Sequence, residues 1–220
     1  MSLQRVLDTA RAELGYTESP PGSNRTKYWE EYDPRFQGQP WCVSGLWWVF
    51  RHAGESSAFF GGAKTASCST ILKWYKEQGM LVPFTEAQAG DIVFLTFHAG
   101  ALPEHCGLVT ERLGVLLHTI EFNTTAGESG AQDNGGCVAF KTRYPYQVVA
   151  VARPKYKEEP MPQEKDYIGR WSEQDMRWAD DAGLIKGYED GTFRPTQPMT
   201  REEVIALLHR YDAAKELGKL

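Results

Sequence analysis

Cys42 is the residue whose surroundings best suit chemistry, because it follows Pro40 and Trp41 in the stretch Gln39-Pro-Trp-Cys-Val-Ser-Gly. Proline disfavours helical geometry in the residue before it and cannot continue a helix backwards, so we expect a helix to begin at or near Cys42. A thiol at a helix N-terminus meets unpaired backbone N–H groups and the positive end of the helix dipole, and both stabilise the thiolate. Cys42 is therefore a candidate nucleophile, and the alternative is an inert cysteine buried among aromatic side chains.

A cysteine nucleophile needs a base that takes its proton and a third group that orients the base. Among the five histidines, His105 begins a predicted strand and is the candidate base. A three-residue hairpin loop at 112–114 would place Glu121 directly opposite His105, with Asn123 as a diagonal neighbour on the same strand face. A loop of two or four residues would shift the register by one and break this arrangement. The sequence thus permits a triad of Cys42, His105 and Glu121, with Asn123 as the alternative third member.

Other uses of the cysteines and histidines remain open. Cys68 also opens a predicted helix and is the rival nucleophile. A zinc site built from histidines 98, 105 and 118 with Cys106 is conceivable, but neighbours 105 and 106 point to opposite faces of a strand. Cys106 and Cys137 are most simply small core residues. We therefore expect neither a metal ion nor an organic cofactor.

The elements that would position these residues follow from hydrophobic periodicity. Helical spacing marks residues 3–14, a helix from Cys42 to Phe50, and roughly 67–77. Strand patterns occupy 90–95, 105–110, 115–123, 136–142 and 147–153. Between the first two helices, residues 16–39 are rich in Pro, Gly, Ser and Asn and are interpreted as a long surface excursion. Helices followed by strands predict an α+β fold in which the helices pack on an antiparallel sheet of five to six strands.

The composition changes after Arg153. Residues 154–166 carry charges and prolines without apolar periodicity, which is typical of a linker. Residues 167–220 are predicted to form a helix–loop–helix unit whose last helix opens with the capping box Thr200-Arg-Glu-Glu203. Two helices bury little core, so this unit is expected to associate with another surface. We therefore divide the chain into a first domain at 1–153, a linker and a second domain.

The net charge and the distribution of apolar residues argue against several classes of protein. The 220-residue chain has a net charge of −5, which gives no reason to expect nucleic acid as a partner. No apolar run approaches the 18 or so residues of a membrane span, and the N-terminal residues lack the apolar region of a signal peptide. We therefore expect synthesis in a cytoplasm, without a signal peptide for the general secretion route.

Five motifs, in order along residues 1–153, resemble the CHAP domain, a papain-like cysteine- and histidine-dependent amidohydrolase and peptidase module. They are Gly22-Ser-Asn24-Arg-Thr-Lys-Tyr28, Pro-Trp-Cys42, Gly90-Asp-Ile-Val-Phe94, His105-Cys-Gly-Leu-Val109 and Glu121-Phe-Asn123, with Asn134-Gly-Gly136 after them. The resemblance implies that Cys42 attacks a carbonyl, that His105 acts as base and then acid, and that Glu121 orients the imidazole with support from Asn123. The Cys42 backbone N–H and either Gln39 or Tyr28 would hold the oxyanion, and Trp41 with Tyr28 would wall the substrate groove. Cys106 departs from the apolar residue that many members carry there.

Residues 167–216 resemble a single S-layer homology (SLH) motif. The resemblance rests on Trp178, Gly183-Leu-Ile-Lys-Gly187, Asp190-Gly-Thr-Phe-Arg-Pro195 and Thr200-Arg201-Glu-Glu203. In that family three motifs usually combine to bind anionic polysaccharide of the Gram-positive wall, so Trp178 and Arg201 are implied binding residues. A chain with one motif would complete the unit as a homotrimer, or use the motif as a weak wall tether.

The two resemblances together imply a phage-type endolysin, that is, a peptidoglycan hydrolase that binds secondary cell-wall polysaccharide through its SLH module. Such an enzyme would be made in the bacterial cytoplasm without a signal peptide and would act on the cell wall after release. Bacteria with SLH modules mostly have directly cross-linked stem peptides, which favours an N-acetylmuramoyl-L-alanine amidase. An endopeptidase of the same fold and a catalytically inactive wall-binding protein are the alternatives.

Overall fold

The computed structural model describes residues 2–98, 102–127, 129–157, 165–188 and 191–216. The chain divides into two compact units, Met1–Glu159 and Pro160–Leu220. Within the described residues, no helix combines the length and the apolar character needed to cross a membrane.

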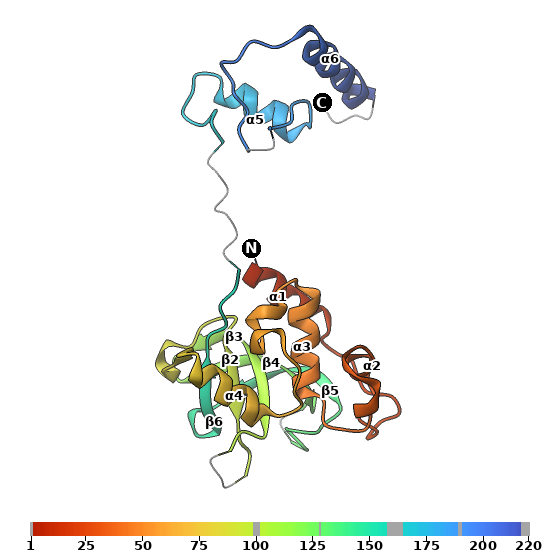
Figure 1. The fold of residues 1–220 in the computed structure, drawn as a ribbon, viewed down its shortest axis with the longest axis vertical. Coiled ribbons are helices and arrows are strands. Elements are labelled where there is room, and N and C mark those ends of the chain that lie inside the picture. The colour runs from red at the N-terminus through yellow and green to blue at the C-terminus, as the bar shows by residue number, and fades with distance from the viewer. Residues whose placement is uncertain (1, 99–101, 128, 158–164, 189–190, 217–220) are drawn as a thin grey trace. The chain divides into compact units, whose positions relative to one another are not determined.

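The first unit is built on one antiparallel sheet of six strands in the order β1-β6-β2-β3-β4-β5 (Figure 1). The strands are β1 (Leu81–Val82), β2 (Ile92–Leu95), β3 (His105–Leu113), β4 (Leu116–Thr124), β5 (Cys137–Arg143) and β6 (Val148–Ala152). Together with the helices, this sheet confirms the predicted α+β class. Only the two-residue β1 among these strands has no counterpart in the predicted pattern.

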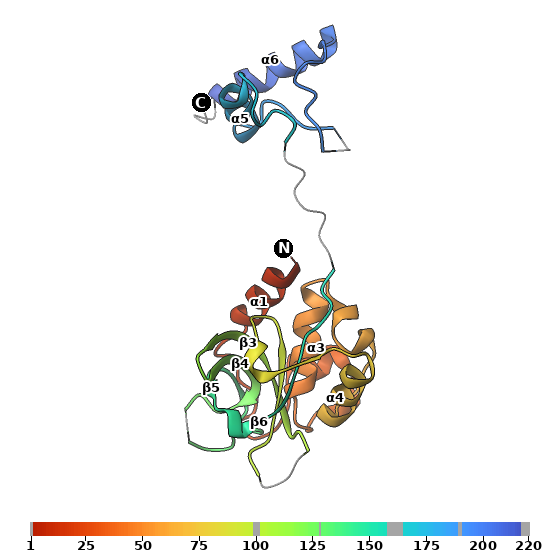
Figure 2. The same cartoon turned by 90° about the vertical axis from the view of Figure 1, so that its left-hand side faces the viewer.

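Four α-helices precede or flank the sheet, namely α1 (Ser2–Ala12), α2 (Lys27–Tyr32), α3 (Cys42–His52) and α4 (Cys68–Glu77). Short 3₁₀ turns occupy Pro34–Phe36, Ser56–Ala58, Phe60–Gly62, Phe84–Glu86 and Pro145–Gln147. Helices α3 and α4 lie on one side of the sheet (Figure 2), and the main core forms between them and the strands. A smaller apolar cluster covers the opposite face of the sheet.

Helix α3 approaches the sheet closely because Gly45 faces β4. A Cβ atom at Gly45 would lie 2.3 Å from the ring of Phe122, a distance that no real side chain occupies. The glycine therefore allows the helix to rest directly on the strand, and burial of Leu46, Val49 and Phe50 holds it there. The packing places the first residue of α3 near the start of β3.

The segment 16–39 is not the surface excursion that its composition predicts. It contains helix α2, and its aromatic residues Tyr28, Trp29 and Tyr32 are buried in the main core. The helix starts at the N-cap Thr26, whose hydroxyl accepts a hydrogen bond from the Trp29 N–H. Apolar burial of large aromatic rings outweighs the turn-forming residues around them.

The second unit contains α5 (Glu173–Asp181) and α6 (Arg201–Glu216). The predicted capping box is confirmed, since the Thr200 hydroxyl accepts from the Glu203 N–H at 3.2 Å and the Glu203 carboxylate accepts from the Thr200 N–H at 2.7 Å. Asp166 accepts hydrogen bonds from the N–H groups of Phe193 and Arg194, which fastens the start of the unit to its loop.

Both ends of the predicted linker pack as part of the flanking units. Tyr156 stacks on Phe50, and its hydroxyl donates to the Gly90 carbonyl. The Lys157 N–H donates to Glu55 at 3.0 Å. At the other end, Asp166 belongs to the second unit. The remainder of the predicted linker, 158–164, lies outside the described residues.

Candidate active site

Cys42 is the first residue of α3, and its helix start is left open. The N-cap Trp41 makes no side-chain capping bond among the described residues, so its side chain does not occupy the first backbone N–H groups of the helix. The Cys42 side chain is 5% exposed and lies on a cleft. A helix N-terminus of this kind stabilises negative charge on a thiolate and on an oxygen anion placed beside it.

His105 begins β3, and its Nε2 lies 3.0 Å from Oε2 of Glu121 on the adjacent strand. Both side chains are fully buried. Neither ring nitrogen has a hydrogen bond of good angle within the described part of the chain. The carboxylate therefore faces the imidazole at ion-pair distance, and the ring is not committed to a competing partner.

The predicted register of this hairpin is wrong, although the predicted pair is close in space. The turn has two residues, since Leu113 pairs with Leu116, and a β-bulge follows between Val109 and Glu111. The observed turn shifts the register by three residues from the predicted one, and the bulge moves it back by one, so the net shift at Glu121 is two residues. Glu121 consequently pairs with Gly107 and reaches His105 as a diagonal neighbour on the same face.

Gly107 leaves the space that the Glu121 side chain occupies. A Cβ atom at position 107 would lie 2.7 Å from Cγ of Glu121. The glycine in His105-Cys-Gly thus allows the carboxylate to lie across β3 and meet the histidine two residues earlier.

Arg143, at the end of β5, anchors Glu121 and was not identified from the sequence. Its guanidinium donates from Nε to Oε1 at 2.7 Å and from Nη2 to Oε2 at 2.5 Å. The Thr119 hydroxyl also donates to Oε1, at 2.7 Å. Arg143 is only 2% exposed, so this is a buried bidentate ion pair. The predicted strand ended at Thr142, so Arg143 lay just outside it and carried no signal of its role.

The charges of the site favour a thiolate and an imidazolium. Hydrogen bonds from Cys106 and Cys68, together with His105, hold the pKa of Cys42 well below its ordinary value despite burial. Burial lowers the pKa of His105, but Cys42 and Glu121 outweigh it and raise that pKa to about 9. Burial raises the pKa of Glu121, whereas Arg143 and His105 bring it down to about 2. Cys42 therefore carries the negative charge opposite a protonated His105.

The rival nucleophile Cys68 lies beside Cys42, with the two sulfurs 3.8 Å apart. Cys106 lowers the pKa of Cys68, but Cys42 and burial raise it well above its ordinary value. The pKa of Cys106 is also raised, by Cys42, Cys68 and burial. The directions of these shifts favour Cys42 as the thiol that ionises first. Cys106 is buried in the main core, as predicted, and its sulfur also lies within 4.8 Å of those of Cys42 and Cys68.

Within the described residues, the hydrogen bonds of the Asn123 side chain go to residues other than His105. It has a positive φ of 62°, and its amide nitrogen donates to Asn134 at 2.9 Å and to Asn24 at 3.3 Å. Its amide oxygen accepts from the Gly136 N–H. These bonds tie β4 to two loops, one at Asn24 and one at 134–136, so Asn123 contacts the loops and not the imidazole.

Two of the three predicted groove residues are not in a groove. Tyr28 and Trp41 are fully buried and stack on each other, with ring centroids 5.3 Å apart. Their polar atoms bond inward, Tyr28 to Glu13 and Trp41 to Glu18, so neither wall nor oxyanion donor is available from them. The third, Gln39, lines the cleft beside Cys42.

The cleft beside Cys42 has a volume of about 580 Å³. Its lining combines Phe36, which is 40% exposed, with the charged residues Arg35 and Glu104. The remaining lining residues are Gln39, Pro40, Cys42, Ala66, Ser67, Cys68, Ser69 and Pro103. A cleft with one aromatic wall and charges of both signs suits a polar, peptide-like substrate.

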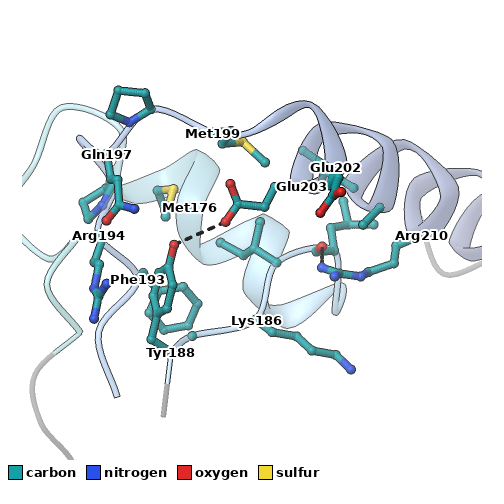
Figure 3. Close-up of a pocket in the computed structure, with 17 residues that line it drawn as sticks. Met176, Lys186, Tyr188, Phe193, Arg194, Gln197, Met199, Glu202, Glu203 and Arg210 are labelled. Carbon is teal, nitrogen blue, oxygen red and sulfur yellow. Dashed lines mark hydrogen bonds between the residues drawn. The ribbon is translucent and has the colours of Figure 1, made fainter. Parts of the chain in front are cut away.

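The second unit has a pocket of about 500 Å³ between its loop and α6 (Figure 3). In this pocket the Tyr188 hydroxyl meets the Glu203 carboxylate at 3.5 Å, and Arg194 and Arg210 contribute positive charge (Figure 3). The predicted binding residues are not part of it. Trp178 is 51% exposed on α5, and Arg201 lines a neighbouring groove along α6. Asp190 of the motif lies outside the described residues.

Residues 165–205 match the sequence profile of the S-layer homology domain. A search of curated proteins found no match.

Several solved structures are similar to this chain, including the following three. The wild-type endolysin LysIME-EF1 is 19% identical with a TM-score of 0.45, over 70% of this chain and 65% of that one. Ly7917 is 21% identical with a TM-score of 0.41, over 70% of this chain and 63% of that one. A lipoprotein-like protein of the NLP/P60 family from Staphylococcus aureus is 18% identical with a TM-score of 0.37, over 71% of this chain and 42% of that one. The chain thus spans less than two thirds of each of these proteins.

Proposed function

We propose that the chain is a peptidoglycan hydrolase that cleaves an amide bond with Cys42 as its nucleophile. The observation that carries this proposal is the arrangement at the start of α3. A thiol with a lowered pKa lies at an open helix N-terminus, beside a buried histidine that faces a carboxylate at 3.0 Å. A nucleophile, a base and an orienting group in this order are the parts that thiolate acyl transfer requires.

The steps follow from the positions of these groups. The Cys42 thiolate attacks the carbonyl carbon, and the resulting oxyanion accepts a hydrogen bond from the backbone N–H at the helix start. The His105 imidazolium donates its proton to the leaving amine, which departs and leaves a thioester on Cys42. Neutral His105 then takes a proton from water, and the hydroxide attacks the thioester to release the acid and restore the thiolate. Glu121 holds the imidazole in position and stabilises its charged form throughout.

The substrate is proposed from the resemblance to CHAP modules and from the second unit. A wall-binding unit of the SLH type would hold the enzyme on the secondary wall polysaccharide, close to peptidoglycan. The two arginines of its pocket suit an anionic polysaccharide. Within peptidoglycan we favour the bond between muramic acid and L-alanine, and a bond of the stem peptide is the alternative.

The test is product analysis of purified sacculi digested by the full chain. An amidase leaves peptides with a free L-alanine N-terminus and glycan free of peptide, whereas an endopeptidase leaves muramoyl-linked stems with new peptide termini. Cys42→Ala should release no product. Cys137→Ala is the matched control, because Cys137 is also a buried free thiol but is not among the three neighbouring thiols at the site. Product release by Cys42→Ala would exclude the proposed nucleophile.

An inactive wall-binding protein is the alternative from another class. It predicts that both the wild type and Cys42→Ala sediment with sacculi and that neither releases soluble product. Binding and hydrolysis measured on the same samples separate the two readings.

A further inference from the structure

Three cysteines from different elements converge at the start of α3. Cys42 and Cys68 open helices α3 and α4, and Cys106 is the second residue of β3. Their sulfur atoms all lie within 4.8 Å of one another, and all three are free thiols. The proposed acyl transfer forms a bond only to Cys42, and the two further thiols take part in none of its bond-making steps.

The spacing of the sulfurs is close to that of a metal–thiolate site. Zinc binds thiolate sulfur at about 2.3 Å in tetrahedral geometry, which places two bound sulfurs about 3.8 Å apart. Cys42 and Cys68 are already at 3.8 Å. Since no distance in the group exceeds 4.8 Å, Cys106 has to move by about 1 Å or less to complete a three-sulfur face.

The site is also accessible and has room for a fourth ligand. Cys42 and Cys68 line the cleft, whereas Cys106 is fully buried beneath them. An ion entering from the cleft therefore meets two sulfurs first and the third behind them. A water molecule on the cleft side would supply the fourth ligand, as in zinc sites that keep one position open.

We propose that the chain binds one thiophilic metal ion, such as Zn²⁺, through the sulfurs of Cys42, Cys68 and Cys106. Binding releases the protons that the thiols still carry and joins Cys42 to the metal. If Cys42 is the nucleophile of the proposed hydrolase, the metal-bound chain is inactive and removal of the ion restores it. The metal site itself does not depend on that function.

The test measures metal binding without substrate. The reduced full chain is titrated with Cd²⁺, whose thiolate complexes absorb in the near ultraviolet, and with Zn²⁺ in competition with a chromogenic chelator. Wild type should bind one ion per chain with the thiolate absorption band. Cys68→Ser and Cys106→Val should each lose tight binding, and Cys137→Ser should keep it, because the Cys137 sulfur instead donates to the Thr124 carbonyl.

Circular dichroism of each variant shows whether it is folded. The inference is overturned if wild type binds no more metal than Cys68→Ser, or if Cys137→Ser loses binding as the cluster variants do. Hydrolysis measured with and without the bound ion separates this inference from the proposed function. Metal binding without any hydrolysis leaves the site standing and removes the function, and hydrolysis without metal binding does the reverse.

Discussion

Glu121 lies between the imidazole of His105 and the buried guanidinium of Arg143, and both partners offset the free-energy cost of burying its carboxylate. A buried carboxylate is costly in free energy unless it is paired and hydrogen-bonded, and here Arg143, Thr119 and His105 provide the partners. The same oxygen, Oε2, faces Arg143 and His105. The orientation of the base is therefore linked to a residue of β5 that does not itself approach Cys42 in the described contacts.

Arg143→Met should lower both stability and activity. The substitution leaves Glu121 buried without its bidentate partner, which costs roughly 3–5 kcal/mol of unfolding free energy. We expect kcat/KM to fall by about 10²–10⁴-fold because the imidazole loses its fixed partner. Chemical denaturation and rate measurements below the new unfolding transition test this.

Arg177→Met is the control for that change. It removes an exposed ion pair with Glu173 in the second unit and should change neither quantity measurably. Equal unfolding free energies of Arg143→Met and wild type would show that the buried pair of Arg143 and Glu121 does not stabilise the fold.

The pH dependence of kcat/KM should follow His105 on its alkaline side. The reactive form needs a protonated imidazole, whose pKa is about 9, so activity should fall as the pH rises through about 9. Because this pKa is raised above the ordinary value of 6.5, the charged pair also stabilises the fold below pH 6.5 and loses that contribution through pH 9. On the acid side, activity should persist well below pH 9, since the pKa of Cys42 is lowered.

Glu121→Gln provides the diagnostic comparison for the pH profile. The substitution removes a charge that raises the pKa of His105. The alkaline limb of the kcat/KM profile should therefore move to lower pH, and kcat/KM itself should fall. A profile of unchanged position would mean that Glu121 does not act on the imidazole.

The hairpin of β3 and β4 shows how far the sequence could predict the site. Alternating apolar residues predicted both strands, and the helix start at Cys42 followed from Pro40. The register was wrong because neither the length of the turn nor the bulge near Thr110 has a sequence signal of its own. The turn shifted the register by three residues and the bulge moved it back by one, and this net shift of two kept His105 and Glu121 on one face.

Other parts of the site depend on packing that the sequence does not display. Tyr28 and Trp41 were placed in a groove because they adjoin the motif, yet stacking with other rings buries them. Arg143 and Cys68 reach the site from segments distant in the chain, and one sequence does not reveal such contacts.

Gly107→Ala tests the close approach of the two strands. A methyl group would lie 2.7 Å from Glu121 Cγ and must displace that side chain from His105. Overpacking of this kind costs about 1–3 kcal/mol. We expect a larger proportional loss in kcat/KM than in stability, measured by kinetics and thermal unfolding.

Gly127→Ala is the matched glycine control. Position 127 has open space around it and an unstrained backbone, so neither activity nor stability should change. Wild-type activity in Gly107→Ala would contradict the role given to the strand contact.

At the scale of the whole molecule, the second unit exposes several large apolar side chains for its size. On α6, Ile205 is 66% and Leu208 is 58% exposed, and Trp171 before α5 is 96% exposed. Among the described residues of this unit, the buried apolar side chains are Tyr167, Leu184 and Ala214. Apolar surface of this kind on a small unit favours association between chains.

We expect the full chain to form a trimer that Ile205→Lys with Leu208→Lys converts to a monomer. Light scattering at the concentration used for activity measures the mass. Val115→Lys is the control, because Val115 is an apolar residue of the first unit with similar exposure, 67%. A monomeric wild type would contradict the prediction.

The two-residue turn at the tip of the hairpin offers a place to modify the chain. Gly114 has open space around it, and Leu113 and Val115 beside it are more than half exposed. The register at Glu121 is held by core residues on both sides of the bulge, so extra residues at the tip need not reach it. An epitope tag inserted between Gly114 and Val115 should leave the enzyme folded and active, as exposed loop tips generally tolerate insertion. Such a tagged chain would allow the protein to be located on cell walls without altering either terminus.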